Sequence, residues 1–340
     1  MTSTRKIFVT VFLLVFSISH SYAQASKKSL EDLLEEYDRD RNTFTLFLIT
    51  FRAKENQSLV VKWIEEKSKT DTQATIFAGK IHRELKDGKR AIQFFESAWN
   101  RGEVSAASEL ADFYLDSSFI EQSKKLSCEW RKRLIEKNPN TTEATEYGIC
   151  LDTSMATIPG FAQSQAMACD WYRRGAEMYF ETHDTAKSYP SLSFNNGRAY
   201  VLYSMCLSEK EYGSLDLKKS GIWAMRSMEL SHPYGTYFYA SKLLDGSGVL
   251  QSNTDGMKYM NKAAELGSSI AQNSMGVIYA EGKITQKNIS EAYKWFVIAQ
   301  GNGYENAKAN KSNAEKLLTP SEINQSQIKA KQWQSKYIDK

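Results

Sequence analysis

Histidine and cysteine side chains supply most of the proton carriers, nucleophiles and soft metal ligands of proteins, so they limit the chemistry that this chain of 340 residues can do. Beyond residue 23 the histidines are His82, His183 and His232. None belongs to a His-Glu-x-x-His motif, and no cysteine pair has the spacing of a zinc ribbon. The sequence therefore predicts no metal site and no cofactor, and we expect each histidine to lie at the surface or in a turn.

Two short motifs come close to catalytic signatures without completing them. Gly276 to Lys283 resembles a phosphate-binding loop, but Ile284 stands where a serine or threonine would hold magnesium. Ser326 and Lys329 form a Ser-x-x-Lys pair, but the Ser-Asp-Asn and Lys-Thr-Gly motifs of penicillin-recognising enzymes are missing from the sequence, as is Gly-x-Ser-x-Gly. These patterns predict no catalytic residue and a protein that is not an enzyme.

The first residues have the composition of a secretory signal peptide. Arg5 and Lys6 precede the apolar run 7–16, and the small residues Ser21 and Ala23 follow it. A membrane-spanning helix needs about 20 apolar residues, which this run does not reach, and no second run of this kind follows. We expect cleavage after Ala23, or two residues later, and a periplasmic or secreted protein without a transmembrane anchor.

The charge of the chain narrows the choice of partners. The formal net charge is +4 at pH 7, and removal of residues 1–23 would take away two cations and no acid. Such a balance argues against a nucleic-acid partner, for which a basic stripe is expected. Asn140–Thr142 and Asn288–Ser290 fit glycosylation triplets, so a eukaryotic secretory origin stands beside a bacterial one.

The C-terminal third of the sequence repeats itself with a period of 36 residues, which is the signature of a repeat architecture. An offset of 165 recovers another copy in residues 92–114, and a further copy surrounds Trp171. We expect five or six units between about Thr72 and Tyr304. The matching pairs of the C-terminal copies are Tyr259 and Trp295, Ala263 and Ala299, Gly267 and Gly303, Ala271 and Ala307, and Gly246 and Gly282.

One unit has the pattern of two helices. The apolar residues from Ala292 to Ala299 recur at i, i+3, i+4 and i+7, which makes one stripe on a helix, and Ser290 is its predicted N-cap. The residues from Ala271 to Tyr279 form a similar stripe on the preceding helix. A single hairpin cannot bury its apolar face, so the sequence predicts an all-α solenoid of stacked helical hairpins.

The sequence resembles the Sel-one-like repeat family, whose members are relatives of the tetratricopeptide repeat. The resemblance is carried by the Leu-Gly-x-x-Tyr-like start in Met275–Tyr279, by the Ala-x-x-Trp-Phe stripe in Ala292–Phe296 and by a capping helix in Leu317–Trp333. Together with the period, it implies an α/α superhelix with a signal peptide at 1–23, an N-terminal helical cap at 24–71, the repeat array at 72–304 and C-terminal capping helices at 305–340. For the amphipathic segment Leu30–Tyr37 of the cap, a partner-binding helix is the alternative interpretation.

The four cysteines recur at equivalent positions of the repeat. Cys128 and Cys169 fall on second helices of units, whereas Cys150 and Cys206 fall on first helices. Each second helix runs antiparallel to the first helix of the next unit, so we expect disulfides between Cys128 and Cys150 and between Cys169 and Cys206. The alternatives are a bridge between Cys150 and Cys169 inside one hairpin, and buried free thiols.

Solenoids of this kind bind other proteins on a concave wall that is lined by the first helix of each unit. The residues of these first helices that are not assigned to the core are the candidate contact residues. Among them we favour Tyr237, because aromatic anchors are enriched at interfaces. The alternative is that these side chains pack against neighbouring parts of the chain. The candidates are Ser108, Asp112, Val201, Met205, Tyr237, Ser241, Asn273 and Val277.

The resemblance and the missing catalytic motifs predict the same function. We expect a monomeric, non-catalytic periplasmic or secreted scaffold or adaptor for a protein partner, with a role in envelope assembly, secretion or host interaction. The alternative is an enzyme that acts on cell-wall peptidoglycan, or an accessory subunit of one.

Overall fold

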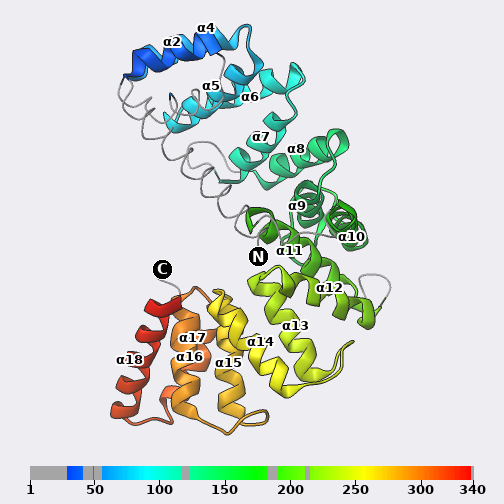
Figure 1. Ribbon diagram of the computed structural model, residues 1–340, viewed down its shortest axis with the longest axis vertical. Coiled ribbons are helices and arrows are strands. Elements are labelled where there is room, and N and C mark those ends of the chain that lie inside the picture. The colour runs from blue at the N-terminus through cyan, green and yellow to red at the C-terminus, as the bar shows by residue number, and fades with distance from the viewer. Residues whose placement is uncertain are drawn as a thin grey trace, which may run out of the picture. The chain divides into compact units, whose positions relative to one another are not determined.

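A computed structural model of the chain describes residues 29–40, 49, 56–116, 123–182, 190–210 and 215–337. These residues form helices and turns, and no strand occurs among them (Figure 1). Within the same ranges, no helix is long and apolar enough to cross a membrane. The chain divides into two compact units, Met1–Asn138 and Pro139–Lys340, each of which is described by itself. The predicted signal peptide lies outside the described residues.

In the first unit, each helix from α4 to α8 packs against the next helix along the chain. The order is α2 (Leu30–Asp40), α4 (Gln57–Ser68), α5 (Thr72–Glu84), α6 (Gly88–Asn100), α7 (Ser105–Asp116) and α8 (Lys124–Lys137).

The helices α2, α4 and α5 share one apolar core. Leu33 and Tyr37 of α2 pack in it with Ile64 of α4 and Ile81 of α5, and all four are buried. The Tyr37 hydroxyl also donates a hydrogen bond of 2.8 Å to Asp71, the residue that caps α5. The apolar stripe of α2 is therefore buried inside the chain.

In the second unit, each helix from α9 to α16 packs against its successor, and α18 packs against α16 (Figure 1). The helices α12, α14 and α16 start at residues 217, 253 and 289, so the period of 36 is kept to the residue. The order is α9 (Thr141–Leu151), α10 (Gln165–Thr182), α11 (Pro190–Cys206), α12 (Leu217–Glu229), α13 (Pro233–Asp245), α14 (Asn253–Glu265), α15 (Ser269–Glu281), α16 (Ile289–Gly301), α17 (Ala307–Glu315) and α18 (Pro320–Tyr337).

The helix ends repeat with the same period. A short polar side chain precedes α12, α14 and α16 and accepts a hydrogen bond from the backbone N–H three residues later, as an N-cap does. The prediction of Ser290 as the cap of α16 was wrong, because Asn288 takes that role. Gly246 and Gly282 end α13 and α15 in the left-handed conformation that favours glycine. The three N-caps are Asp216, Ser252 and Asn288.

Within a hairpin, a glycine on the first helix lets a ring of the second helix lie directly on its backbone. A Cβ atom added at Gly276 would lie 2.4 Å from the ring of Phe296, closer than any real side chain allows. The same contact occurs in α5 with α6 and in α9 with α10, so a small residue allows close helix packing in all three hairpins. The three pairs are Gly79 and Phe95, Gly148 and Tyr172, and Gly276 and Phe296.

His232 joins α11 and α13 of the second unit. It caps α13, because its Nδ1 atom accepts a hydrogen bond of 3.1 Å from the N–H of Gly235. Its Cβ atom lies against Gly197 of α11, where an added methyl group would come within 2.5 Å. Burial, and to a smaller extent the nearby Arg198 guanidinium, lowers the pKa of His232 to about 4. The cap therefore needs the neutral imidazole.

We predict that Gly276→Ala lowers the free energy of unfolding by about 1–3 kcal/mol, since the new methyl group overpacks a buried ring. Gly301→Ala is the matched control on the second helix of the same hairpin, where the nearest atom to an added Cβ is 3.9 Å away. It should leave stability unchanged or raise it slightly. Urea unfolding followed by circular dichroism gives both values, and equal effects would contradict the packing account.

We predict that acid weakens the fold through His232. The unfolded histidine has a pKa of about 6.5. Below that pH, His232 therefore binds a proton in the unfolded chain that it does not bind in the folded chain. Stability should be complete above about pH 6.5 and should fall by roughly 2–3 kcal/mol as the pH drops to about 4. His232→Asn keeps an N-cap that does not titrate. Urea titrations from pH 7 to 4 should give a smaller loss for this variant, and an equal loss would contradict the assignment.

Candidate protein-binding surface

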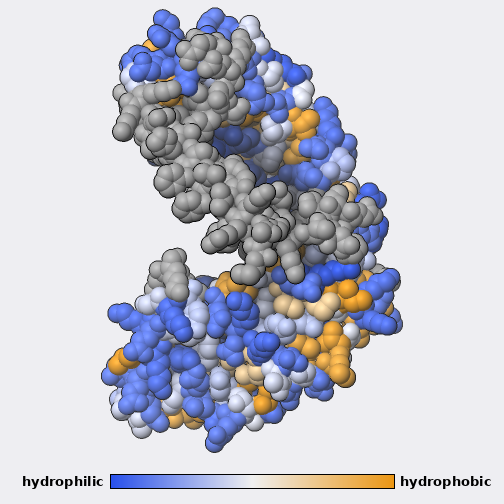
Figure 2. All heavy atoms as spheres, viewed as in Figure 1, coloured by the Kyte–Doolittle hydropathy of each residue, from blue (hydrophilic) through white to orange (hydrophobic). Residues whose placement is uncertain are grey.

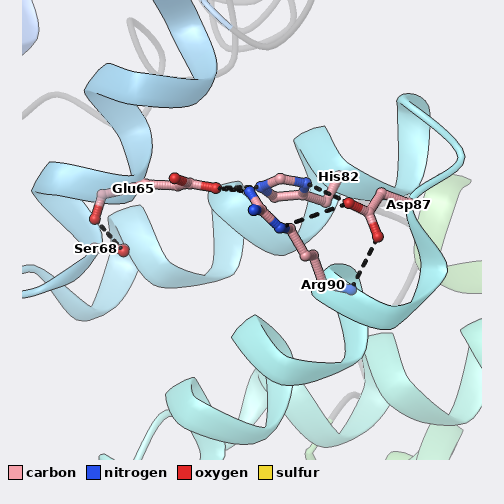
Figure 3. Close-up of polar contacts among 5 residues, drawn as sticks. All are labelled: Glu65, Ser68, His82, Asp87 and Arg90. Carbon is pink, nitrogen blue, oxygen red and sulfur yellow. Dashed lines mark hydrogen bonds and ion pairs between the residues drawn. The ribbon is translucent and has the colours of Figure 1, made fainter.

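The first unit contains a cluster of three charged side chains around one imidazole (Figure 3). The Nε2 atom of His82 lies 3.1 Å from Glu65 of α4, and its Nδ1 atom lies 3.7 Å from Asp87 before α6. Arg90 reaches the same Glu65 carboxylate at 2.5 Å and Asp87 at 3.7 Å. The imidazole also stacks on the ring of Phe94, with 5.2 Å between the ring centres.

This cluster joins helices and does not form an open site. The His82 side chain is only 3% exposed, and burial lowers its pKa against the opposing effect of the Glu65 carboxylate. A group so deeply covered cannot reach a substrate, so the cluster ties α4 to α5 and α6. Among the described residues, no group of three or more His, Cys, Asp or Glu side chains is arranged to hold a metal ion.

The prediction that the histidines lie at the surface or in a turn was wrong for His82, which is buried within α5, whereas His232 does lie in a turn, before α13, but is buried there. His82 and His232 are 2% and 5% exposed, while His183 lies outside the described residues. Both buried rings contact side chains or backbone of neighbouring helices, and the spacing of residues in the sequence does not reveal such contacts.

In the second unit, the first helices of the hairpins form an inner row. Each of α9, α11, α13 and α15 packs against the first helix of the next hairpin, up to α17, in addition to its neighbours along the chain. No comparable packing joins α10 to α12 or α12 to α14. Helices that approach each other in this way line the inside of a curve, so α11, α13 and α15 line the inner side of this unit.

Two of the predicted contact residues on this row are buried, and we correct those two assignments. Val201 is 1% exposed on α11, which packs against both α9 and α13. Asn273 is 9% exposed on α15, and its side-chain oxygen accepts a hydrogen bond of 3.0 Å from Asn310 of α17. The neighbouring first helices cover these positions because the inner row is tightly packed.

The other candidates of the second unit are partly exposed. Met205, Tyr237, Ser241 and Val277 are half-buried. Val277 packs against the core cluster of α16, and Ser241 donates a hydrogen bond to the backbone of its own helix. Tyr237 is also half-buried and packs against the core cluster that contains Met260 and Met275, beside the ring of Tyr234. It is the aromatic member of this set, and aromatic side chains are enriched at interfaces, so it is the strongest of the predicted contact residues.

The helix α13 carries a longer aromatic stripe than the sequence analysis recognised. Tyr234 stacks on Tyr237 with 5.7 Å between ring centres and lies 6.4 Å from Phe238. All three rings are half-buried, and burial raises the pKa of Tyr234, with a smaller effect of Tyr304 before α17. The i, i+3 and i+4 spacing of the three rings is the signal that was available in the sequence.

A buried cation lies at the end of this stripe. Lys242 is 3% exposed, and its Nζ atom donates hydrogen bonds of 3.0 Å to the Ser208 hydroxyl and of 3.4 Å to the Ser247 carbonyl. It also lies 5.0 Å from the centre of the Phe238 ring. Burial lowers the pKa of Lys242. We define Tyr234, Tyr237 and Phe238 as the α13 stripe.

The first-unit candidates are on α7. Ser108 is half-buried, whereas Asp112 has a side chain that is 59% exposed. The Asp112 carboxylate accepts a hydrogen bond of 2.7 Å from the almost buried Arg131 guanidinium of α8. This ion pair fixes Asp112 within its own hairpin.

All four cysteines are disulfide-bonded. Cys169 of α10 is linked to Cys206 of α11, with 5.8 Å between their Cα atoms. This bond joins the second helix of one hairpin to the first helix of the next, as the repeat register predicts. The pairing of Cys128 with Cys150 stays a prediction.

Comparison with known proteins agrees with this architecture. A family model described as the Sel1 repeat matches residues 104–138, 159–180, 233–268 and 269–299. The chain is therefore a Sel1-repeat protein. The matched segments coincide with α7 and α8, with part of α10, and with the hairpins of α13 and α15, so these Sel1 repeats are helical hairpins of the array.

Solved structures share the fold at low sequence identity. The crystal structure of a Sel1 repeat protein from Oxalobacter formigenes superposes with a TM-score of 0.57 at 17% identity, covering 74% of this chain and 95% of that one. The crystal structure of c5321, a protective antigen present in uropathogenic Escherichia coli strains and displaying an SLR fold, gives a TM-score of 0.35 at 17% identity, covering 91% and 88%. Only the first superposition is close enough to support the fold. No curated protein matches the sequence.

We predict that replacing Cys169 and Cys206 together by serine lowers the free energy of unfolding by about 4 kcal/mol, because their bond closes a loop across a sequence separation of 37. Chemical denaturation without reductant measures the loss. Peptide mapping of the oxidised wild-type protein should recover Cys128 linked to Cys150, and a peptide linking Cys150 to Cys169 would contradict the assigned pairing.

Proposed function

We propose that this Sel1-repeat protein is a non-catalytic scaffold that binds a protein partner through the α13 stripe. The observation that carries the proposal is the row of three half-buried rings along α13, which is a helix of the inner row. Rings held in place by their neighbours lose little conformational freedom on binding, and tyrosine is among the residues that most often dominate interface energies.

The architecture supports this function. Sel1 repeats are scaffolds typical of protein–protein interaction, and stacked hairpins form extended inner surfaces suited to it. The hydroxyls of Tyr234 and Tyr237 add polar groups beside the rings, which gives the stripe the mixed character of an interface centre. The partner would contact Tyr237 first, with Met205 and Ser241 at the edge of the contact.

The disulfides are compatible with a protein that works outside the cytoplasm, where oxidising conditions preserve such bonds. We propose a periplasmic or secreted monomer with a role in envelope assembly, secretion or host interaction. A cell-wall enzyme is the alternative, but no arrangement of the described side chains favours it. The Ser208 hydroxyl beside Lys242 is already engaged with Ser204 and Ser220 in a packed network.

The test is capture of a partner by the oxidised full-length protein, with cross-linking and mass spectrometry to identify it. We predict that Tyr237→Ala weakens the captured complex by more than about 1 kcal/mol and changes the thermal midpoint little. Tyr239→Ala is the matched control on the same helix, because Tyr239 faces the Tyr259 ring of α14.

Isothermal titration with the identified partner gives the affinity of each variant per folded molecule. Equal affinity for the Tyr237 and Tyr239 variants would contradict the proposed surface. A sharp fall of the midpoint for Tyr237→Ala, without a change of affinity, would show that Tyr237 is a core residue.

A further inference from the structure

The second unit exposes a group of large apolar side chains where α12 starts. Leu217 and Ile222 of α12 are 38% and 40% exposed, Leu215 just before the helix is 50% exposed, and Leu250 after α13 is 90% exposed. In Figure 2 an apolar area covers this part of the molecule, over α12 and the turn between α13 and α14. We name these four residues the α12 patch.

The turn after α13 is packed firmly against α12. A Cβ atom added at Gly248 would lie 1.8 Å from the backbone oxygen of Leu217, and one added at Gly221 would lie 2.6 Å from the Val249 side chain. These contacts leave no gap between the two segments. They hold Leu250 beside the first turns of α12, so the patch is one surface built from two segments.

The fold does not require apolar residues at these positions. The helices α12 and α14 are related by the period of 36, so each patch residue has a counterpart in the following hairpin. All four counterparts are polar, although the backbone there has the same helix boundaries. In the order Leu215, Leu217, Ile222 and Leu250, the counterparts are Gln251, Asn253, Lys258 and Gln286.

The charged residues beside the patch also differ from their counterparts in the other hairpins. Lys218 and Lys219 occupy the first turn of α12, where the partial positive charge of a helix N-terminus disfavours cations. The corresponding turns of α14 and α16 carry Asp255 and Glu291, which that charge favours. Lys218 is exposed, and the Lys219 side chain is 65% exposed and pairs with the Asp216 cap at 3.6 Å. The lysines oppose the local preference of the helix, so helix stability does not explain them.

We propose that the α12 patch binds a short acidic segment of a protein partner, with the apolar side chains of the segment on the leucines and its carboxylates on Lys218 and Lys219. A second copy of this chain fits less well, because two-fold pairing would bring the lysines of both copies together. The apolar positions are confined to the start of α12 and the turn after α13, which fits a short segment better than an extended lipid surface. The inference rests on the proposed scaffold function and adds a second contact to the α13 stripe.

The repeat itself supplies substitutions that the fold accepts. Leu250→Gln with Ile222→Lys installs the residues of the next hairpin and removes the apolar contact. Lys218→Thr with Lys219→Asp installs its first turn and removes the charges. Leu317→Gln is the matched control, because Leu317 is 69% exposed in the same unit but lies between α17 and α18.

The probe is a fluorescent helical peptide that has leucine at every third or fourth position and glutamate elsewhere, beside a version with lysine in place of glutamate. Fluorescence anisotropy with the oxidised full-length protein should show binding of the acidic peptide only. Each double variant should weaken it at least tenfold, and Leu317→Gln should leave it unchanged. Added salt should weaken binding to the wild type more than to the Lys218→Thr, Lys219→Asp variant.

Three results would overturn the proposal. The first is failure of the acidic peptide to bind, or equal binding by the patch variants. The second is binding to vesicles of phosphatidylglycerol that the patch substitutions abolish while peptide binding is absent. The third is self-association in sedimentation that the same substitutions abolish. If partner capture still depends on Tyr237 in that case, the proposed function holds and only the proposal for the α12 patch is wrong.

Discussion

Close contact between a small residue on one helix and a large side chain on its partner is the constraint on which this structure depends. At Gly276 the ring of Phe296 occupies the space that any side chain would need, and Gly79 and Gly148 repeat the arrangement in other hairpins. Because the two helices approach so closely, the hairpin has a fixed geometry. That geometry lets successive hairpins stack, and stacking buries the apolar faces that one hairpin would leave in water.

The same constraint separates the residues that the fold needs from those it does not. Caps, glycines and rings recur every 36 residues and set the helix boundaries, as Asp216, Ser252 and Asn288 show. Surface positions are free to differ between hairpins, and most are polar. The adjacent helices α12 and α13 depart from this pattern twice, with aromatic side chains along α13 and with leucines and lysines where α12 starts. The proposed function rests on these two departures in neighbouring helices.

Sequence periodicity was sufficient for the architecture, because the apolar stripes and the glycines are local and repeat in register. The all-α hairpin array follows from them, and so does a bridge between Cys169 and Cys206. Contacts between helices of different hairpins were not accessible in this way. Val201 and Asn273 were assigned to the surface because a single hairpin leaves them free, but the neighbouring first helices cover them. His232 was placed in a turn correctly but at the surface wrongly, since its burial depends on Gly197 of another helix.

The central claim is that the partner binds to the adjacent helices α12 and α13, while the other helices of the array hold these two in place. Hydrogen exchange of the full-length protein, measured by mass spectrometry with and without the captured partner, tests this most directly. The account predicts slower exchange in α12, in α13 and in the turn between α13 and α14, with α16 and α18 unchanged. Protection confined to helices outside this region, such as α5 to α8, or equal exchange in both states, would contradict it.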